Sequence, residues 1–312
     1  MRTQMRTKWV GLMGVMLIGA ATAARADLFV IERFEYPSGN NTLQLDSFAG
    51  GGTGWGGNWT DTGAGLGATF QTNNFFVHSL PPAGGMPAAA GGSMNKAANN
   101  PSYNQRTTAD MSTYFEDGDT VWFSYVLAVR GPMSNRFNLG FGTTANTGNG
   151  SGFGISLNAT GSAGAVSTPA TLHARINDTL SADSISLTLS TNGFGVSGHN
   201  PAFFVVGRLT MGVGAGTDVL DLWVNEGTTL PGTPTLSLTG VSLSSTPDRF
   251  SFFTPPTTVP TSGLPQTALW LDEIKMGTSE VDLGLTLVPE PSTIAMLLLG
   301  AGFLWRRRSA RG

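Results

Sequence analysis

Three acidic side chains in one short turn form the densest set of candidate metal ligands in the 312-residue chain. Glu116, Asp117 and Asp119 surround Gly118 directly before an apolar stretch. Calcium prefers several oxygen ligands from carboxylates and backbone carbonyls, and a turn of this composition can supply them. The same residues are also typical of a solvated Asp-Gly turn that starts a strand. The sequence favours the solvated turn, keeps calcium as the alternative, and indicates no other cofactor.

Pairs of carboxylates can also hydrolyse glycosides, provided that both flank the same scissile bond. Asp218 and Asp221 are three residues apart, and an expected strand begins directly after Asp218. Asp272 and Glu273 are adjacent in another expected strand. Because side chains alternate between the two faces of a strand, the members of each pair should point to opposite faces. Only the turn at 116–119 could bring carboxylates together, so the sequence predicts a non-enzymatic protein, with a glycoside hydrolase as a distant alternative.

The residue types of most other active sites are missing from the sequence. The chain has no cysteine, which excludes thiolate metal sites and cysteine nucleophiles. Its three histidines lack HExxH spacing, and no GxSxG nucleophile elbow is present. Setting aside Glu290 and the eight basic residues near the two ends leaves 9 basic and 19 acidic residues, a net charge of −10. Such a body should repel phosphates, so we expect no nucleic-acid partner.

Two tryptophans lie in the glycine-rich stretch Gly-Gly-Thr-Gly-Trp-Gly-Gly-Asn-Trp. They are Trp55 and Trp59. An exposed indole can stack on a sugar ring, and neighbouring glycines would allow a close approach. A buried indole instead contributes about 150–250 Å² of surface to a core. The sequence favours the buried interpretation for both and keeps glycan stacking as the alternative.

The first 26 residues have the organisation of a secretory signal peptide. A cationic region ends at Lys8, an apolar run covers residues 9–21, and Ala24 and Ala26 flank Arg25 as a small-residue cleavage site. We expect export through the Sec translocon and cleavage by signal peptidase after Ala26. An uncleaved anchor helix is the alternative, and the shortness of the apolar run favours cleavage.

A carboxylate stands between two prolines near the other end of the chain, in Pro289-Glu290-Pro291. Each proline fixes its own φ, and Pro291 also disfavours the helical region for Glu290. We therefore expect an extended, exposed peptide over residues 288–291. Such a peptide with a single carboxylate is suited to binding in a peptidase cleft.

An apolar run and an arginine cluster follow this tripeptide. The run covers residues 294–305 and is shorter than the roughly 18 residues expected for a spanning helix. Arg306, Arg307 and Arg308 come directly after it and should stay on the cytoplasmic side of the membrane. The sequence predicts a short transmembrane helix that holds the protein in the inner membrane for a limited time.

The tail resembles the PEP-CTERM sorting signal in the order and spacing of its parts. The resemblance covers about the last 25 residues: Pro289-Glu290-Pro291, then the apolar stretch, then the arginine cluster. It implies export in a Gram-negative bacterium and processing by an exosortase, a membrane-embedded cysteine transpeptidase-like enzyme. Proteins with this signal resemble surface or matrix proteins that are made alongside exopolysaccharide. A plain C-terminal anchor is the alternative.

The body between the two terminal signals has the pattern of many short strands separated by Gly, Asn and Pro. Alternation is clearest in the stretch VWFSYVLAVR at 121–130, where apolar side chains occupy both faces. Strands are expected at 29–34, 121–130, 136–141, 152–158, 171–176, 184–189, 203–213, 219–225, 235–243, 249–253 and 268–276. Loops are expected at 81–101, 142–154 and 255–265. No amphipathic helix of ten residues is evident, so the sequence predicts an all-β, antiparallel sandwich.

Three stretches of the body resemble concanavalin A-like (laminin G-like) jelly rolls. They are FEYPSGNNTLQLDSFAGGGTGWGGNWT, FFVVGRLTMGVGAGTDVLDLWVNE and ALWLDEIKMGTSEVDL. The resemblance implies that the first and last strands, at 28–34 and 269–276, pair and bring the two ends together. Glycoside hydrolases of this fold carry a Glu-x-Asp-x-x-Glu strand, and no such string occurs here.

Together these observations predict three parts: a signal peptide at 1–26, a β-sandwich at 27–287 and a sorting signal at 288–312. We expect a secreted protein that is sorted by an exosortase to the cell surface or the extracellular polysaccharide matrix, with a structural or adhesive role in a biofilm. A carbohydrate-binding module for exopolysaccharide is the alternative function. Expected partners are the exosortase, signal peptidase, the Sec translocon, exopolysaccharide and, transiently, the inner membrane.

Overall fold

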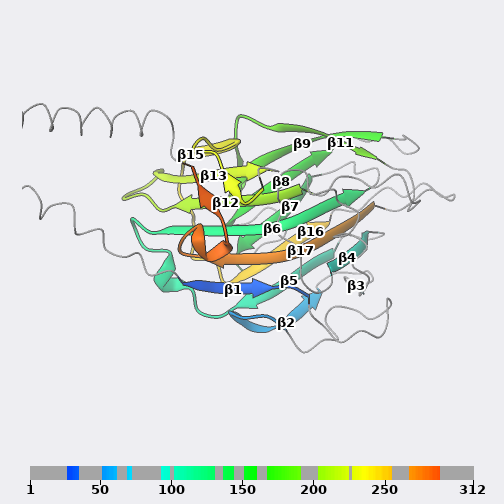
Figure 1. Ribbon diagram of the computed structural model, residues 1–312, viewed down its shortest axis with the longest axis horizontal. Helices are drawn as coiled ribbons and strands as arrows, with labels where there is room; N and C mark the ends of the chain where they lie inside the picture. Colours follow the sequence, from blue (N-terminus) through cyan, green and yellow to red (C-terminus); the bar gives the residue numbers. More distant parts are fainter. Residues whose placement is uncertain are drawn as a thin grey trace, which may run out of the picture.

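Antiparallel β-strands form the two large sheets of the described body. The computed structural model describes residues 27–34, 51–61, 69–71, 93–98, 102–130, 136–143, 151–159, 167–190, 203–224, 227–254 and 267–288. Over these ranges the only helical turns are the 3₁₀ segments η2 (Ser112–Tyr114) and η3 (Val281–Leu283), and no helix is long and apolar enough to cross a membrane. The all-β, antiparallel class is therefore confirmed (Figure 1). The expected signal peptide and membrane helix lie outside the described residues.

One eight-stranded sheet contains the clearest strand predicted from the sequence, β6. Its order is β15 (Leu236–Val241), β13 (Asp218–Val224), β12 (Phe203–Thr210), β6 (Thr120–Arg130), β17 (Thr267–Gly277), β4 (Ser93–Ala98) and β3 (Thr69–Gln71). The strand β1 (Leu28–Glu32) also pairs with β17, and its register places Leu28 opposite Gly277 and Glu32 opposite Ile274. The predicted pairing of the first and last strands is confirmed.

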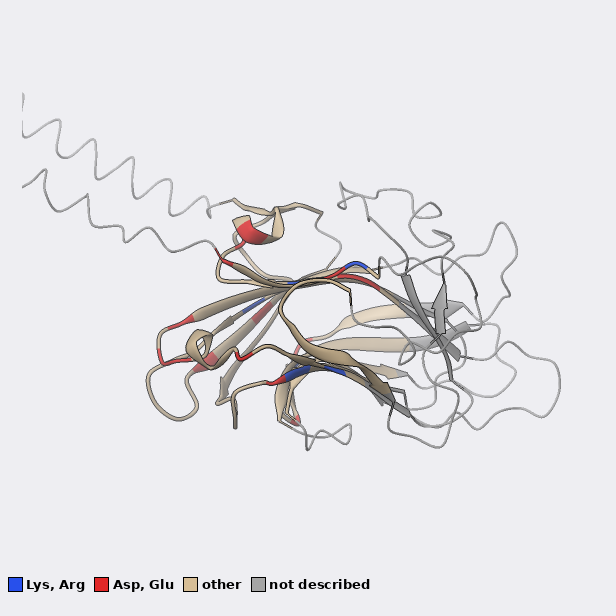
Figure 2. Ribbon diagram, turned by 90° about the horizontal axis from the view of Figure 1, so that it is seen from below, with Lys and Arg blue, Asp and Glu red and all other residues tan. Residues whose placement is uncertain are grey.

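A second eight-stranded sheet faces the first. Its order is β10 (Thr179–Leu180), β9 (Ser167–Ile176), β8 (Gly152–Ala159), β7 (Arg136–Gly142), β16 (Arg249–Thr254), β5 (Ser102–Thr108) and β2 (Trp55–Asp61), with β11 (Ile185–Ser190) also paired to β9. Seen edge-on, the two sheets form two layers (Figure 2). Aromatic side chains fill the space between them: Phe123 of β6 lies 6.1 Å from Phe141 of β7, and Tyr125 lies 6.1 Å from Phe250 of β16.

The alternation in β6 has the consequence that its sequence predicts. Phe123 and Tyr125 are fully buried in the core between the sheets. Trp122 and Val126 belong to a second apolar cluster on the outer face of the same sheet. The segment after β17 covers that cluster with η3 and with β18 (Thr286–Leu287), which pairs in parallel with β14 (Thr229–Leu230). Both faces of β6 are therefore covered, as expected from its two apolar faces.

The structure corrects several expectations about loops and strand ends. The strand β4 lies within the expected loop at 81–101. The strand β7 ends at 142 and β8 begins at 152, so both strands reach into the loop expected at 142–154. The strands β2 and β5 form where no strand was expected. The first strand ends at Glu32, because Phe34 has a left-handed φ of 52° that no regular strand accepts. The expected loop at 255–265 lies outside the described residues.

Candidate functional site

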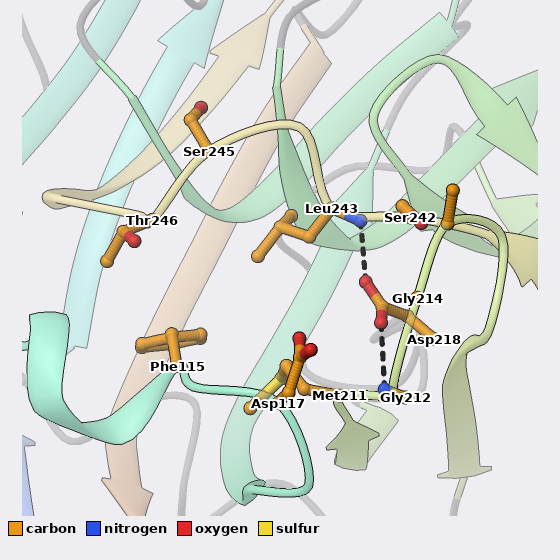
Figure 3. A pocket seen from close by; sticks show the side chains of 11 residues that line it. Phe115, Asp117, Met211, Gly212, Gly214, Asp218, Ser242, Leu243, Ser245 and Thr246 are labelled. Carbon is orange, nitrogen blue, oxygen red and sulfur yellow. Dashed lines mark hydrogen bonds between the residues drawn. The ribbon is translucent and has the colours of Figure 1, made fainter.

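Three turns from distant parts of the chain meet at one end of the sandwich and surround a cavity of about 420 Å³. They are the turn at 115–118, the turn at 211–217 between β12 and β13, and the turn at 242–246 after β15. Figure 3 shows the side chains of these turns around the cavity. A volume between about 300 and 1,000 Å³ is typical of small-molecule sites.

The carboxylate of Asp218 connects two of the turns. Its Oδ1 accepts a hydrogen bond of 2.9 Å from the Gly212 N–H, and its Oδ2 accepts one of 2.6 Å from the Leu243 N–H (Figure 3). The side chain is 6% exposed. Because both oxygens accept hydrogen bonds from backbone amides, Asp218 holds the wall of the cavity in place.

Two further hydrogen bonds hold the turns around the cavity. The Gly118 N–H donates to the Met211 carbonyl at 2.9 Å, which fixes the 115–118 turn against the end of β12. On the other side, the Asn177 amide donates to the Ser242 carbonyl at 2.8 Å. Asn177 has a left-handed φ of 52°, a conformation that asparagine tolerates better than most residues. The cavity is thus lined by turns that are fixed before any ligand arrives.

The candidate calcium ligands do not converge. Asp119 turns back onto its own loop, where its Oδ2 accepts a 2.9 Å hydrogen bond from the Glu116 N–H. Glu116 and Asp117 are exposed. Among the residues that the structure describes, no group of three His, Cys, Asp or Glu side chains could hold a metal ion. This geometry agrees with a turn closed by its own hydrogen bond, and calcium binding at this turn stays a prediction. Asp117 alone lines the cavity.

The two tryptophans considered for glycan stacking lie against the core. Trp59 is only 1% exposed and packs between Phe34, at 5.9 Å, and Phe252, at 6.2 Å, so it has no free face for a sugar. Trp55 is half-buried, donates to the Ile31 carbonyl at 2.9 Å and has the Arg106 guanidinium 4.7 Å from its ring. Glycan stacking on Trp59 is therefore wrong, and stacking on Trp55 stays a prediction.

A buried ion pair lies beneath these tryptophans. Glu32 is fully buried and Arg106 is 3% exposed. Glu32 binds the Arg106 guanidinium and accepts hydrogen bonds from the Phe34 N–H at 2.8 Å and the Trp59 indole N–H at 3.4 Å. Arg106 also donates to the Gly57 carbonyl at 2.9 Å. The pair connects β1, β2 and β5, and therefore holds the two sheets together at this edge.

Two further carboxylates are buried near this pair. Asp272 and Glu273 are 3% and 2% exposed, because a bulge in β17 and a φ of 50° at Glu273 interrupt the alternation expected for a regular strand. Glu273 pairs with Lys275 at 3.1 Å. The Oδ2 atom of Asp272 has no hydrogen-bond partner. Burial, together with the negative charges of Glu273 and Glu32, raises the pKa of Asp272 to about 8.

The described chain ends where the predicted sorting signal starts. Val288 donates its N–H to the Leu230 carbonyl at 2.8 Å, next to the β14–β18 pair. At the start of the described chain, Asp27 exchanges hydrogen bonds of 3.2 Å with Thr278. Ala24, Ala26, the Pro289-Glu290-Pro291 tripeptide and the arginines at 306–308 lie outside the described residues. The body is therefore fixed at both of its ends.

Comparison with known families identifies this tail. The model of the PEP-CTERM protein-sorting motif matches residues 287–308. The chain carries a PEP-CTERM sorting motif. The PEP-CTERM motif indicates export and sorting at the membrane, and it implies recognition by an exosortase. Its first residue, Leu287, is the last residue of β18, so the PEP-CTERM segment begins directly at the folded body.

Solved structures that match the chain do so at low identity. One belongs to a study of botulinum neurotoxin type C, whose cell entry is dependent upon interaction with two ganglioside molecules. It has a TM-score of 0.37 and 14% identity, and the match covers 72% of this chain and 45% of that one. Another is of a receptor binding domain, with a TM-score of 0.39, 12% identity and coverage of 82% and 49%. The chain thus spans less than half the length of these structures. No curated protein matches the chain.

Proposed function

We propose that this protein is exported, processed by an exosortase and displayed at the cell surface or in the extracellular polysaccharide matrix, where its concanavalin A-like sandwich has a structural or adhesive role. The observation that carries the proposal is the PEP-CTERM motif at 287–308. In this scheme, residues 1–26 direct export, residues 27–287 form the displayed body and residues 288–312 are the sorting signal.

The position of the motif supports this order of events. The apolar run at 294–305 holds the precursor in the inner membrane, and Arg306, Arg307 and Arg308 keep its end on the cytoplasmic side. Glu290 then lies just outside the membrane, two residues after Val288. Because Val288 is hydrogen-bonded to the body, cleavage near Glu290 releases a folded sandwich with almost no residual tail.

Four buried carboxylates of the described body are poorly placed for catalysis on a polymer. Asp218 is buried and uses both oxygens to accept hydrogen bonds from backbone amides. Glu32, Asp272 and Glu273 are buried at 3% exposure or less and cannot reach a polymeric substrate. Glycoside hydrolysis needs an accessible acid and an accessible second carboxylate on either side of one bond.

The sorting step is tested by replacing the acidic residue of the motif. We expect Glu290→Ala, and likewise the double change Pro289→Ala with Pro291→Ala, to leave full-length protein in the inner membrane, because the extended carboxylate peptide is lost. The measurement is immunoblotting of membrane and extracellular fractions of the native host.

Glu280→Ala is the matched control, because it removes a carboxylate from the same end of the body without touching the motif. It should be processed like the wild type. The sorting proposal would be overturned if the Glu290→Ala protein reached the extracellular fraction with unchanged size and yield.

A further inference from the structure

We infer that the cavity between the turns at 115–118, 211–217 and 242–246 is a binding site for a neutral or amine-bearing sugar unit. The inference goes beyond sorting and display, since it assigns the displayed body a ligand. It also places the candidate glycan site away from Trp55 and Trp59, at a set of turns with accessible polar groups.

The first argument is that the cavity is built in advance. Asp218 ties Gly212 to Leu243, and Gly118 ties the third turn to Met211. A ligand that enters therefore does not have to order the turns, which would cost conformational entropy.

The second argument is the match between the lining groups and a sugar. The exposed hydroxyls of Ser245 and Thr246 can donate to or accept from sugar hydroxyls, and the exposed carboxylate of Asp117 can accept from two of them. The half-buried ring of Phe115, held 5.8 Å from Phe153, provides an apolar surface for the C–H face of the sugar. Figure 3 shows Asp117 and Phe115 on one side of the cavity and the two hydroxyls on the other.

The third argument is charge. The lining contains two carboxylates and no basic side chain. A uronate or a sulfated sugar would be repelled, because no cation faces it. A neutral hexose or an amino sugar has no such penalty.

A basic peptide is the main competitor, because Asp117 could pair with a lysine. Sugar is favoured because both oxygens of Asp218 already accept hydrogen bonds from backbone amides, so Asp117 is the lining carboxylate with oxygens available to a ligand, beside two hydroxyls and an aromatic ring. These groups can form several hydrogen bonds with an uncharged ligand but only one ion pair with a basic one. A calcium-dependent sugar site is not supported, since these turns do not bring three acidic ligands together.

The test is ligand-observed NMR on the purified full chain in detergent, with glucose, galactose, glucosamine, glucuronate and trilysine as probes. We expect millimolar binding of at least one of the first three and none of glucuronate. Asp117→Asn and Thr246→Ala should each weaken that binding by about tenfold, as expected when a hydrogen bond to a ligand is lost. Glu116→Gln is the matched control, because it removes a charge from the same turn without lining the cavity, and it should bind like the wild type.

The inference is overturned if none of the three sugars binds, if glucuronate binds as well as they do, or if only trilysine binds. It is also overturned if Glu116→Gln weakens binding as much as Asp117→Asn while both keep the wild-type melting temperature. Glu290→Ala should leave sugar binding unchanged, so a failure of the sorting proposal can be distinguished from a failure of this one.

Discussion

Arg106→Met is expected to lower the free energy of unfolding by about 3–5 kcal/mol, the range measured when one partner of a buried ion pair is removed. The change removes the guanidinium from the fully buried Glu32 carboxylate, which also accepts hydrogen bonds from the Phe34 and Trp59 N–H groups. Methionine fills a similar volume, so the loss comes from removal of the buried ion pair rather than from a cavity. Equilibrium unfolding in urea, followed by tryptophan fluorescence, measures it.

Arg33→Met provides the comparison for this result. Arg33 is 42% exposed in its side chain and lies 3.8 Å from Glu273, so its removal should cost less than about 1 kcal/mol. Adding Glu32→Gln to Arg106→Met should recover part of the lost stability, because it removes the uncompensated charge. Equal losses for Arg106→Met and Arg33→Met would show that the buried pair does not hold this edge together.

Asp272→Asn is expected to stabilise the protein at alkaline pH. The pKa of Asp272 is about 8 in the folded protein, against an ordinary value of about 3.9 in the unfolded chain. Between these two values the folded state binds the additional proton, so this residue makes stability fall as pH rises, by up to about 1.4 kcal/mol per pH unit. Asparagine mimics the protonated carboxyl and removes that dependence.

The measurement is the free energy of unfolding of Asp272→Asn and wild type between pH 5 and 9. The difference in favour of the variant should grow with pH up to about 8 and then level off. The groups that face Asp272 are Glu32, Glu273 and Lys275, and all three are kept in the variant. Asp183→Asn, an exposed change, should leave the pH profile unaltered. Parallel curves for Asp272→Asn and wild type would contradict the assignment.

The strands that could be predicted from sequence are those whose own residues carry the pattern. In β6, alternation of large apolar side chains predicts both the strand and its two covered faces. The strand β4 has the sequence Ser-Met-Asn-Lys-Ala-Ala, with little intrinsic preference for a strand. It forms by pairing with β17 and β3, and such pairing is decided by distant residues.

The site features depend still more on distant partners. Glu32 and Arg106 are 74 residues apart in sequence and meet only because β1 and β5 lie near each other in facing sheets. The bulge that buries Asp272 beside Glu273 breaks the period-two rule on which the sequence prediction rested. The sorting signal is the opposite case: its residues are contiguous, so order and spacing alone identify it.

Removal of the sorting tail is tested most directly by the intact mass of the wild-type protein recovered from outside the host cells. We predict a chain that starts at Asp27 and ends close to Glu290, without the apolar run at 294–305 and without Arg306, Arg307 and Arg308. Recovery of an extracellular chain that still ends at Gly312 would contradict processing by an exosortase.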